Sequence, residues 1–163
     1  MLGAGLLSNV PGLRSFERQG GYYGLASAAS NDYRGYMQSG DFRAGDVYRV
    51  LSPNDREQGA YFLIRKHGVL ANELFSESQK RRNWNEGAYQ CYLAAKHVDR
   101  VVVERGYRTQ FPTNEQRLLD ASVLRGEARV VYGAPGARIV VYDVTQFRDA
   151  IPAPTSLKAC GAL

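Results

Sequence analysis

Four valines stand almost without interruption in the stretch VDRVVVER, residues 98–105, and its charged residues lie mainly toward the ends. A strand with one face in water alternates polar and apolar residues, whereas a nearly continuous apolar strand must be covered on both faces. Buried parallel strands of this kind occur where helices pack against a sheet. We therefore expect the chain to fold around a buried strand at 98–105, in an α/β arrangement.

The segments before this strand alternate between strand and helix patterns. DVYRVL (46–51) favours a strand, because Val, Tyr and Leu are common in pleated, half-buried positions. SPNDRE then supplies a helix N-cap, a first-turn proline and a capping-box acid in the right order, so we expect a helix from there to Gly68. VLAN (69–72) predicts a short buried strand. NEGAYQCYLAAKH (85–97) predicts a helix with the tyrosines, Leu93 and the alanines on its apolar side.

The segments after this strand continue the alternation. TNEQRLLDASVLRG (113–126) predicts a helix that begins with a Thr113 and Gln116 capping box and ends at Gly126. The leucines that we expect to face the core are Leu118, Leu119 and Leu124. ARVVY and ARIVVYDV then flank GAPG, which is typical of an antiparallel hairpin.

Together these elements predict one domain. We expect residues 46–148 to form a single three-layer α/β domain, with a mostly parallel sheet, VDRVVVER at its centre and the C-terminal antiparallel hairpin at one edge. A chain of 163 residues is long enough for one such domain and short for two. Residues 1–45 predict an irregular lead-in rich in Gly, Ser and Tyr, where only ASNDYRGYMQSG favours a short helix. We expect residues 149–163 to be a disordered tail.

Composition narrows the functional classes. Hydrophobic residues make up 44% and charged residues 23%, as in ordinary globular domains. The net charge of +5, from 21 Lys and Arg against 16 Asp and Glu, favours anionic surroundings such as phosphates, nucleic acid or a membrane surface. It falls short of the dense basic stripe of a dedicated nucleic-acid binder, so there is no strong nucleic-acid signal.

Cysteine usage and apolar runs bear on location. Cys91 falls inside a predicted helix and Cys160 in the small-residue tail, so we do not expect a disulfide framework, although an extracytoplasmic location stays open. The apolar runs are far shorter than the roughly 20 residues of a transmembrane helix, which predicts no transmembrane segment. MLGAGLLSNV has no basic region and a short apolar block, so it does not predict a signal peptide.

Motifs for cofactors, metals and nucleophiles are missing from the sequence. There is no GxxxxGK[ST] loop, and GAGLLS has no strand before it as a dinucleotide fingerprint would require. His67 and His97 are thirty residues apart without partners at ligand spacing, so we predict no metal. Cys91 is interpreted as a small core residue, and Asp99 lacks the acid-x-Lys pair of a metal-dependent nuclease. We predict no cofactor and assign no catalytic residue.

The candidate site follows from the sheet. Ligands of open α/β sheets bind beyond the carboxyl ends of parallel strands. Polar clusters follow each predicted strand: Ser52, Asn54, Asp55 and Arg56 after the first, Asn72 and Glu73 after the second, and Glu104, Arg105 and Tyr107 after the third. If they converge, we expect Asn54, Arg56, Glu73 and Glu104 to line a cleft. The alternative is that these residues are helix caps and solvated charges.

The stretch NELFSESQKRRNW (72–84) has two interpretations. In a helix, Glu77 would pair with Lys80 and Arg81, which are ordinary surface pairs worth roughly 0.2–0.5 kcal/mol each. In an anion site, Arg81 or Arg82 would instead face the cleft, because guanidinium groups bind phosphate and carboxylate through paired N–H donors. Trp84 would then be a stacking platform for a ligand, or otherwise a lid on the core.

Five stretches carry a resemblance to a known family: VYRVLSPNDRE, HGVLANELFSES followed by RRNW, KHVDRVVVERGY, TNEQRLLD and VVYDV. They are similar to the soluble C-terminal portion of large bacterial polytopic membrane proteins, of the glycosyltransferase-like kind or related to 6-pyruvoyl-tetrahydropterin synthase. The resemblance covers about residues 46–148. It implies that a membrane-spanning part, absent from this chain, carries the transfer chemistry, and that a compact α/β domain follows on the extracytoplasmic side.

Three functional hypotheses follow. The first, implied by the resemblance, is a non-catalytic extracytoplasmic domain that associates with the membrane through a partner or an upstream region and binds a glycan, a lipid-linked phosphate or a partner subunit. The second is a small stand-alone α/β enzyme, cytoplasmic in location, that acts on a phosphorylated or nucleotide-like substrate. The third, a nucleic-acid module, depends only on the net charge and the KRR run.

Overall fold

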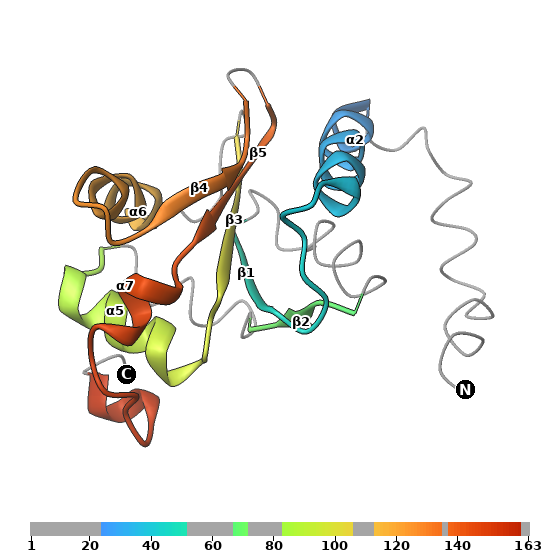
Figure 1. Cartoon of the computed structure of the whole chain (residues 1–163). Helices are drawn as coiled ribbons and strands as arrows, with labels where there is room; N and C mark the ends of the chain where they lie inside the picture. The colour runs from blue at the N-terminus through green and yellow to red at the C-terminus, as the bar shows by residue number, and fades with distance from the viewer. Residues whose placement is uncertain (1–23, 52–66, 72–82, 106–112, 135–136, 161–163) are drawn as a thin grey trace, which may run out of the picture.

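A computed structural model describes residues 24–51, 67–71, 83–105, 113–134 and 137–160. In these ranges a sheet forms the middle of the molecule, with helix α2 on one face and helices α5, α6 and α7 on the other (Figure 1). These helices packed on a sheet confirm an α/β architecture. Every helix within the described ranges falls short of the length and apolarity that crossing a bilayer demands.

The sheet has five strands in the spatial order β2-β1-β3-β5-β4. Their bounds are Val47–Leu51 for β1, Val69–Leu70 for β2, Arg100–Glu104 for β3, Arg129–Tyr132 for β4 and Ile139–Asp143 for β5. β1 runs parallel to both β2 and β3, whereas β5 runs antiparallel to both β3 and β4. The sheet is thus mixed: β1, β2 and β3 form its parallel part, and β5 and β4 add an antiparallel part beside β3.

Strand β3 occupies the centre of the sheet, as its apolar sequence predicts. Val101 and Val103 are buried on the face covered by α5 and α6, and Val102 is buried on the opposite face, toward α2. Burial on both faces is the reason that this strand shows no alternation between polar and apolar residues. The buried charged residue of this strand is Arg100, which stands at its first position.

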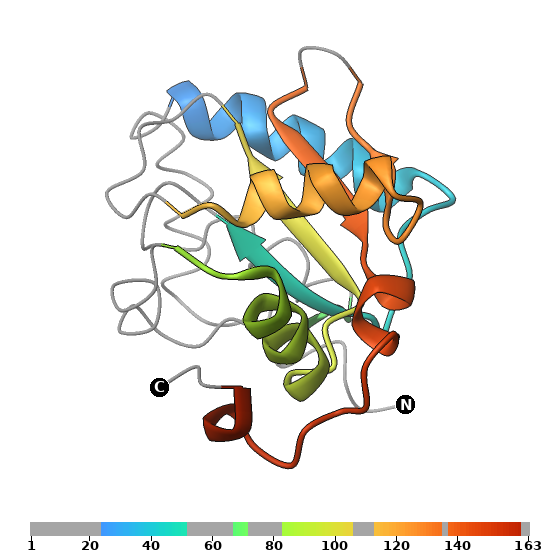
Figure 2. The same cartoon turned by 90° about the vertical axis from the view of Figure 1, so that its left-hand side faces the viewer.

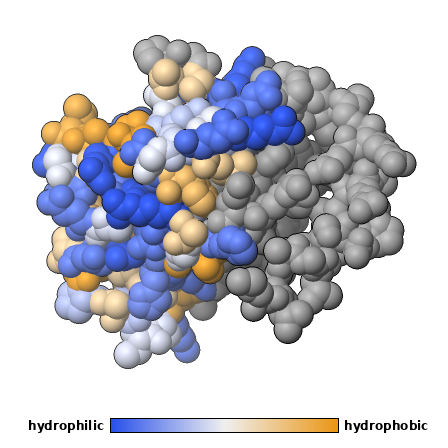
Figure 3. Space-filling view, turned by 45° about the vertical axis from the view of Figure 1, so that its right-hand side comes forward, coloured by the Kyte–Doolittle hydropathy of each residue, from blue (hydrophilic) through white to orange (hydrophobic). Residues whose placement is uncertain are grey.

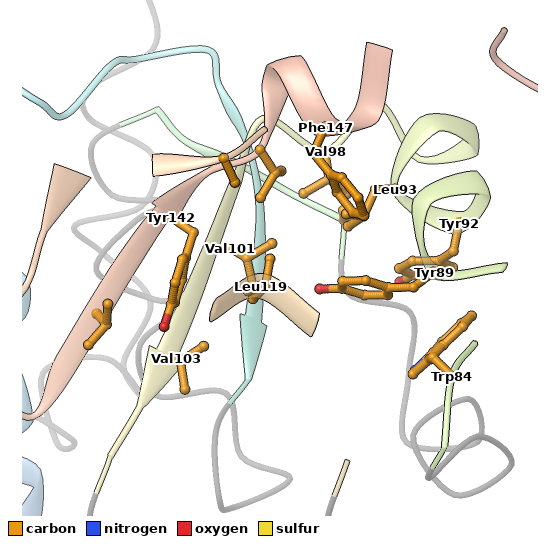
Figure 4. Packing of buried hydrophobic residues seen from close by; sticks show 14 residues of the cluster. Trp84, Tyr89, Tyr92, Leu93, Val98, Val101, Val103, Leu119, Tyr142 and Phe147 are labelled. Carbon is orange, nitrogen blue, oxygen red and sulfur yellow. The ribbon is translucent and has the colours of Figure 1, made fainter. Parts of the chain in front are cut away.

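Helix α5 spans Glu86–Ala95 and follows the prediction closely. The side chain of Asn85 caps its first turn by accepting a hydrogen bond from the backbone N–H of Ala88 at 2.8 Å. Tyr89, Tyr92 and Leu93 form its buried side. Figure 4 shows these side chains packing with Trp84, Val101 and Leu119 in the larger of the two core clusters.

Helix α6 spans Glu115–Leu124, and two details differ from the prediction. The predicted capping box of Thr113 and Gln116 does not form: the N-cap residue is Asn114, whose side chain makes no capping hydrogen bond and instead bonds to the backbone of Trp84. Leu124 is 89% exposed, whereas Leu119 is buried. Five positions separate these two leucines, which rotates Leu124 by about 140° around the helix. Gly126, with φ +75°, ends the helix as predicted.

The region before β1 contains helix α2, Gly24–Gln38, where the sequence predicts an irregular lead-in with at most a short helix. Tyr33 and Tyr36 lie on one side of α2 and are buried against the sheet, in the second core cluster with Tyr48, Val50 and Val102. Tertiary burial of these tyrosines explains a helix that has little apolar periodicity of its own.

The C-terminal region also differs from the prediction. Helix α7, Thr145–Asp149, and a short 3-10 helix, η2 at Leu157–Cys160, lie beside α5 (Figure 2). A disulfide joins Cys91 of α5 to Cys160 of η2, with their Cα atoms 5.4 Å apart. The expectations that no disulfide forms and that the described part of this tail is disordered are therefore wrong. The physical reason is that folding brings together two cysteines 69 residues apart in the sequence.

Candidate functional site

The carboxyl ends of the parallel strands lie at one edge of the sheet, which we call the carboxyl edge. Leu51 of β1 pairs with Val103 of β3, so these two strands end side by side, and β2 ends next to Tyr48, three positions earlier along β1. The predicted ligand residues that follow these strands are Asn54, Arg56, Glu73, Arg81 and Arg82, all of which lie outside the described residues. Their convergence stays a prediction.

Glu104 is the one predicted ligand residue that the structure describes. It ends β3, is half-buried on the face toward α2, and accepts a hydrogen bond from the Tyr33 hydroxyl at 2.8 Å. Close by in the fold, Asp32 of α2 accepts a hydrogen bond from the backbone N–H of Arg138, and Arg105 N–H donates to the Arg138 carbonyl at 2.6 Å. These bonds hold α2 against the carboxyl edge.

The starts of α5 and α6 are tied together. Asn114 accepts a hydrogen bond from Trp84 N–H and donates one to the Trp84 carbonyl, both at 2.8 Å. Trp84 is 7% exposed, and its ring contacts those of Tyr89 and Tyr92 at centroid distances of 5.7 and 5.1 Å. This packing supports the interpretation of Trp84 as a lid on the core.

A buried ion pair crosses the face covered by α5 and α6, and the sequence analysis did not find it. Arg49, in the middle of β1, donates from Nε and Nη2 to the two carboxylate oxygens of Glu115, at 2.6 and 2.7 Å. Its Nη1 donates to the Tyr92 hydroxyl at 2.7 Å, and its guanidinium lies 4.8 Å from the centre of that ring. The only sequence signal was a single arginine inside the apolar strand VYRVL.

The electrostatics of this cluster follow from its burial. Arg49 and Glu115 are 6% and 2% exposed. Desolvation alone would lower the pKa of Arg49, but the adjacent Glu115 carboxylate outweighs it and raises that pKa, so the guanidinium stays charged. Burial raises the pKa of Tyr89 well above its usual range, which keeps that phenol neutral. Arg49 and Glu115 therefore form a buried ion pair that is surrounded by neutral aromatic side chains.

A second ionic network lies at the opposite edge of the sheet, where β1 and β3 begin. Arg100 Nε donates to Asp46 at 2.9 Å, and Arg100 Nη1 lies 2.6 Å from the carboxylate of Asp143. Asp143 also accepts hydrogen bonds from Arg129 at 3.0 Å and from the Thr145 hydroxyl at 2.7 Å. Because its members are paired with one another, this network joins β1, β3, β4 and β5.

Comparison with other proteins adds no relative: neither a family model, nor a curated protein, nor a solved structure matches this chain. Within the described ranges, His, Cys, Asp and Glu side chains do not gather in groups of three or more that would bind a metal ion. The candidate site is therefore the carboxyl edge, framed by Glu104, Tyr33 and the joined starts of α5 and α6.

Proposed function

We propose that this chain is a non-catalytic extracytoplasmic domain of a membrane glycosyltransferase-like system, and that its carboxyl edge binds a lipid-linked phosphate. A glycan or a partner subunit would occupy the same edge in the other forms of this hypothesis. In a three-layer domain with a C-terminal hairpin, this edge is the place where the segments that follow β1, β2 and β3 leave the sheet.

The observation that carries the proposal is that the carboxylates in and beside the sheet are hydrogen-bonded within the fold. Each accepts a hydrogen bond from a neighbouring side chain; the carboxylate and donor pairs are Asp46 with Arg100, Asp99 with Arg148, Glu104 with Tyr33, Glu115 with Arg49, and Asp143 with Thr145. Carboxylates held in this way fix how neighbouring elements fit together and are already engaged within the fold. Their use supports a binding domain over a hydrolase.

The disulfide supports the extracytoplasmic part of the proposal. Disulfides persist in oxidising compartments and are rare in the cytosol. The Cys91–Cys160 bond closes a long loop across the C-terminal half of the domain. A domain that contains such a bond is suited to the outer side of a bacterial membrane, the location that the resemblance also implies.

A specific observation favours the enzyme alternative. The carboxyl edge combines the ends of the parallel strands β1, β2 and β3 with the joined starts of α5 and α6. Backbone N–H groups at the start of a helix favour the binding of anions. A small α/β enzyme that acts on a phosphorylated or nucleotide-like substrate would use the same edge. Such an enzyme would differ from a binding domain by converting its substrate to product, and we assign no catalytic residue to that reaction.

The test is cosedimentation of the chain with zwitterionic vesicles that contain or lack a polyprenyl phosphate. We expect binding only to the phosphate-bearing vesicles, and a loss of about ten-fold in affinity for the Arg81→Gln/Arg82→Gln variant, because two guanidinium contacts are removed. The matched control is Arg43→Gln/Lys158→Gln, which removes the same charge from two exposed positions, one before the start of β1 and one in η2.

The outcomes separate the hypotheses. Equal loss in both double variants would show non-specific charge attraction, and no binding to either vesicle would contradict the proposal. Hydrolysis of a phosphorylated or nucleotide substrate by the wild-type chain would favour the enzyme alternative. Binding of DNA that weakens steeply with added salt would favour the nucleic-acid module.

A further inference from the structure

The last described segment, residues 150–160, leads from α7 past α5 and ends in η2, which lies beside α5 (Figure 2). We call it the C-terminal strap. Among the described residues, its hydrogen bonds stay inside the segment, as in the bond from Ala159 N–H to the Ser156 carbonyl at 3.1 Å. Its attachments to the body are the disulfide from Cys160 to Cys91 and the packing of a partly buried Leu157 against the larger core cluster.

Helix α7, which precedes the strap, has attachments of its own. The Phe147 ring is buried in the core, and the Phe147 carbonyl accepts a hydrogen bond from the Gln90 amide at 2.6 Å. Arg148 forms an ion pair with Asp99 at 2.6 Å and donates to the carbonyls of His97 and Val98. The chain is thus anchored up to residue 149 without help from the disulfide.

The two core clusters also depend little on the strap. Fully buried side chains from β1, β3, β5, α2, α5 and α6 make up most of them; of the strap, only the partly buried Leu157 packs against the larger cluster. Over the described residues that face the viewer in Figure 3, hydrophilic and hydrophobic residues are interspersed.

We propose that the strap is redox-releasable: the disulfide holds residues 150–160 on α5, and a dithiol reductant frees them while the sheet stays folded. A thiolate of the dithiol attacks one sulfur of the bond and forms a mixed disulfide, and its second thiol displaces the protein sulfur. Two electrons and two protons pass to Cys91 and Cys160, which become thiols, and the dithiol becomes a disulfide. The device is independent of the function proposed above.

The test is amide hydrogen exchange, followed by mass spectrometry, on oxidised chain and on chain reduced with dithiothreitol and alkylated. On reduction, exchange in residues 155–160 is expected to rise by at least about ten-fold and to approach the rate of an unfolded chain, whereas β3, which loses only the disulfide's share of global stability, stays at least about a hundred-fold slower than the strap. The Cys91→Ser/Cys160→Ser variant, without any reductant, is expected to match the reduced chain. Unchanged exchange in the strap would overturn the proposal.

Two further outcomes keep the proposal falsifiable. If exchange in β3 becomes as fast as exchange in the strap, the whole fold is lost on reduction and the strap is not a separate unit. The packing control is Leu157→Ala in oxidised chain, which keeps the disulfide and removes the other attachment. This variant is expected to keep the strap protected; release as complete as that caused by reduction would show that packing, and not the disulfide, holds it.

Discussion

At the scale of single residues, the fold contains charges where an apolar core would be expected. Arg49 lies in the middle of β1 and is neutralised by Glu115, a residue 66 positions away in the sequence. Removing two charges from water is costly, and bidentate geometry with a further bond to Tyr92 offsets that cost. Such a pair specifies how β1, α5 and α6 fit together more than it adds to stability.

This reasoning predicts an asymmetry between single and double substitutions. Glu115→Leu leaves the Arg49 guanidinium buried without its carboxylate and is expected to lower the free energy of unfolding by about 3–5 kcal/mol. The double variant Arg49→Met/Glu115→Leu removes both charges and is expected to cost much less than the sum of the losses in Arg49→Met and Glu115→Leu. Urea unfolding of wild type, the two single variants and the double variant measures the coupling, and strictly additive losses would contradict it.

The pH dependence of stability is expected to reflect Asp143. Burial alone would raise the pKa of its carboxyl, but hydrogen bonds from Thr145, Arg100 and Arg129 outweigh burial and hold the pKa well below its usual range. The contribution of Asp143 to the free energy of unfolding is therefore fully present above the pKa of about 3.9 that an aspartate has in the unfolded chain. This contribution is lost as the pH falls through the lower pKa of the folded protein. Asp143→Asn should cost about 2 kcal/mol at pH 7 and progressively less below pH 4 or so.

The measurement is urea unfolding of wild type and Asp143→Asn between neutral and acidic pH. Asp149→Asn is the control, since the Asp149 side chain is 63% exposed, although its ion pair with Arg148 also lowers its pKa. An exposed pair contributes little, so this variant should change stability only slightly at any pH. A cost of Asp143→Asn that stays constant down to acidic pH would contradict the assignment.

At the scale of elements, the packing of α2 on the sheet depends on close approach at Gly35. A methyl group there would collide with the hydroxyl of Tyr132 in β4, whose ring packs against Tyr36 at a centroid distance of 5.4 Å. Tyr36 in turn shares a hydrogen bond with the Tyr48 hydroxyl of β1 at 3.2 Å. Gly35 thus allows a layer of tyrosines to form between α2 and the sheet.

We expect Gly35→Ala to destabilise the protein by about 1 kcal/mol, because the collision outweighs the better helix propensity of alanine. In a Tyr132→Phe background the hydroxyl is gone, so the same substitution should be neutral or slightly stabilising. Thermal unfolding of the four proteins tests this reversal. An equal cost in both backgrounds would show that the contact with Tyr132 is not what excludes a side chain.

At the scale of the whole molecule, the disulfide restricts the unfolded chain. It closes a loop of 69 residues that includes β3, α6, β4, β5 and α7. Loop-closure entropy for a bond of this separation corresponds to about 4 kcal/mol, against a total stability of roughly 5–15 kcal/mol for a typical domain. The bond therefore contributes a large share of the stability even though it anchors only a short strap.

The Cys91→Ser/Cys160→Ser variant is accordingly expected to unfold at a lower urea concentration, with a loss of about 2–4 kcal/mol and one cooperative transition. Wild type in the presence of dithiothreitol should unfold at the same urea concentration as the variant. Identical unfolding midpoints for the oxidised and reduced proteins would contradict this expectation.

Features that depend on neighbours in the sequence were predictable. The valines of β3 identified the buried central strand, and helical spacing identified Tyr89, Tyr92 and Leu93 as the buried side of α5. Gly126 marked the end of α6 because the backbone there is left-handed, a conformation that glycine adopts without steric cost. At the candidate site, the place of Glu104 at the end of β3 was predicted, but its bond to Tyr33 of α2 was not.

Features that join distant parts of the chain were decided only by the tertiary structure. The insertion of β5 between β3 and β4, the pairing of Arg49 with Glu115, and the bond from Cys91 to Cys160 each connect segments that share no local pattern. Helix α2 likewise forms on a segment without clear periodicity, because the sheet buries its tyrosines. Local spacing determines which face of an element is apolar; which partner covers that face depends on the free energy of the whole packed chain.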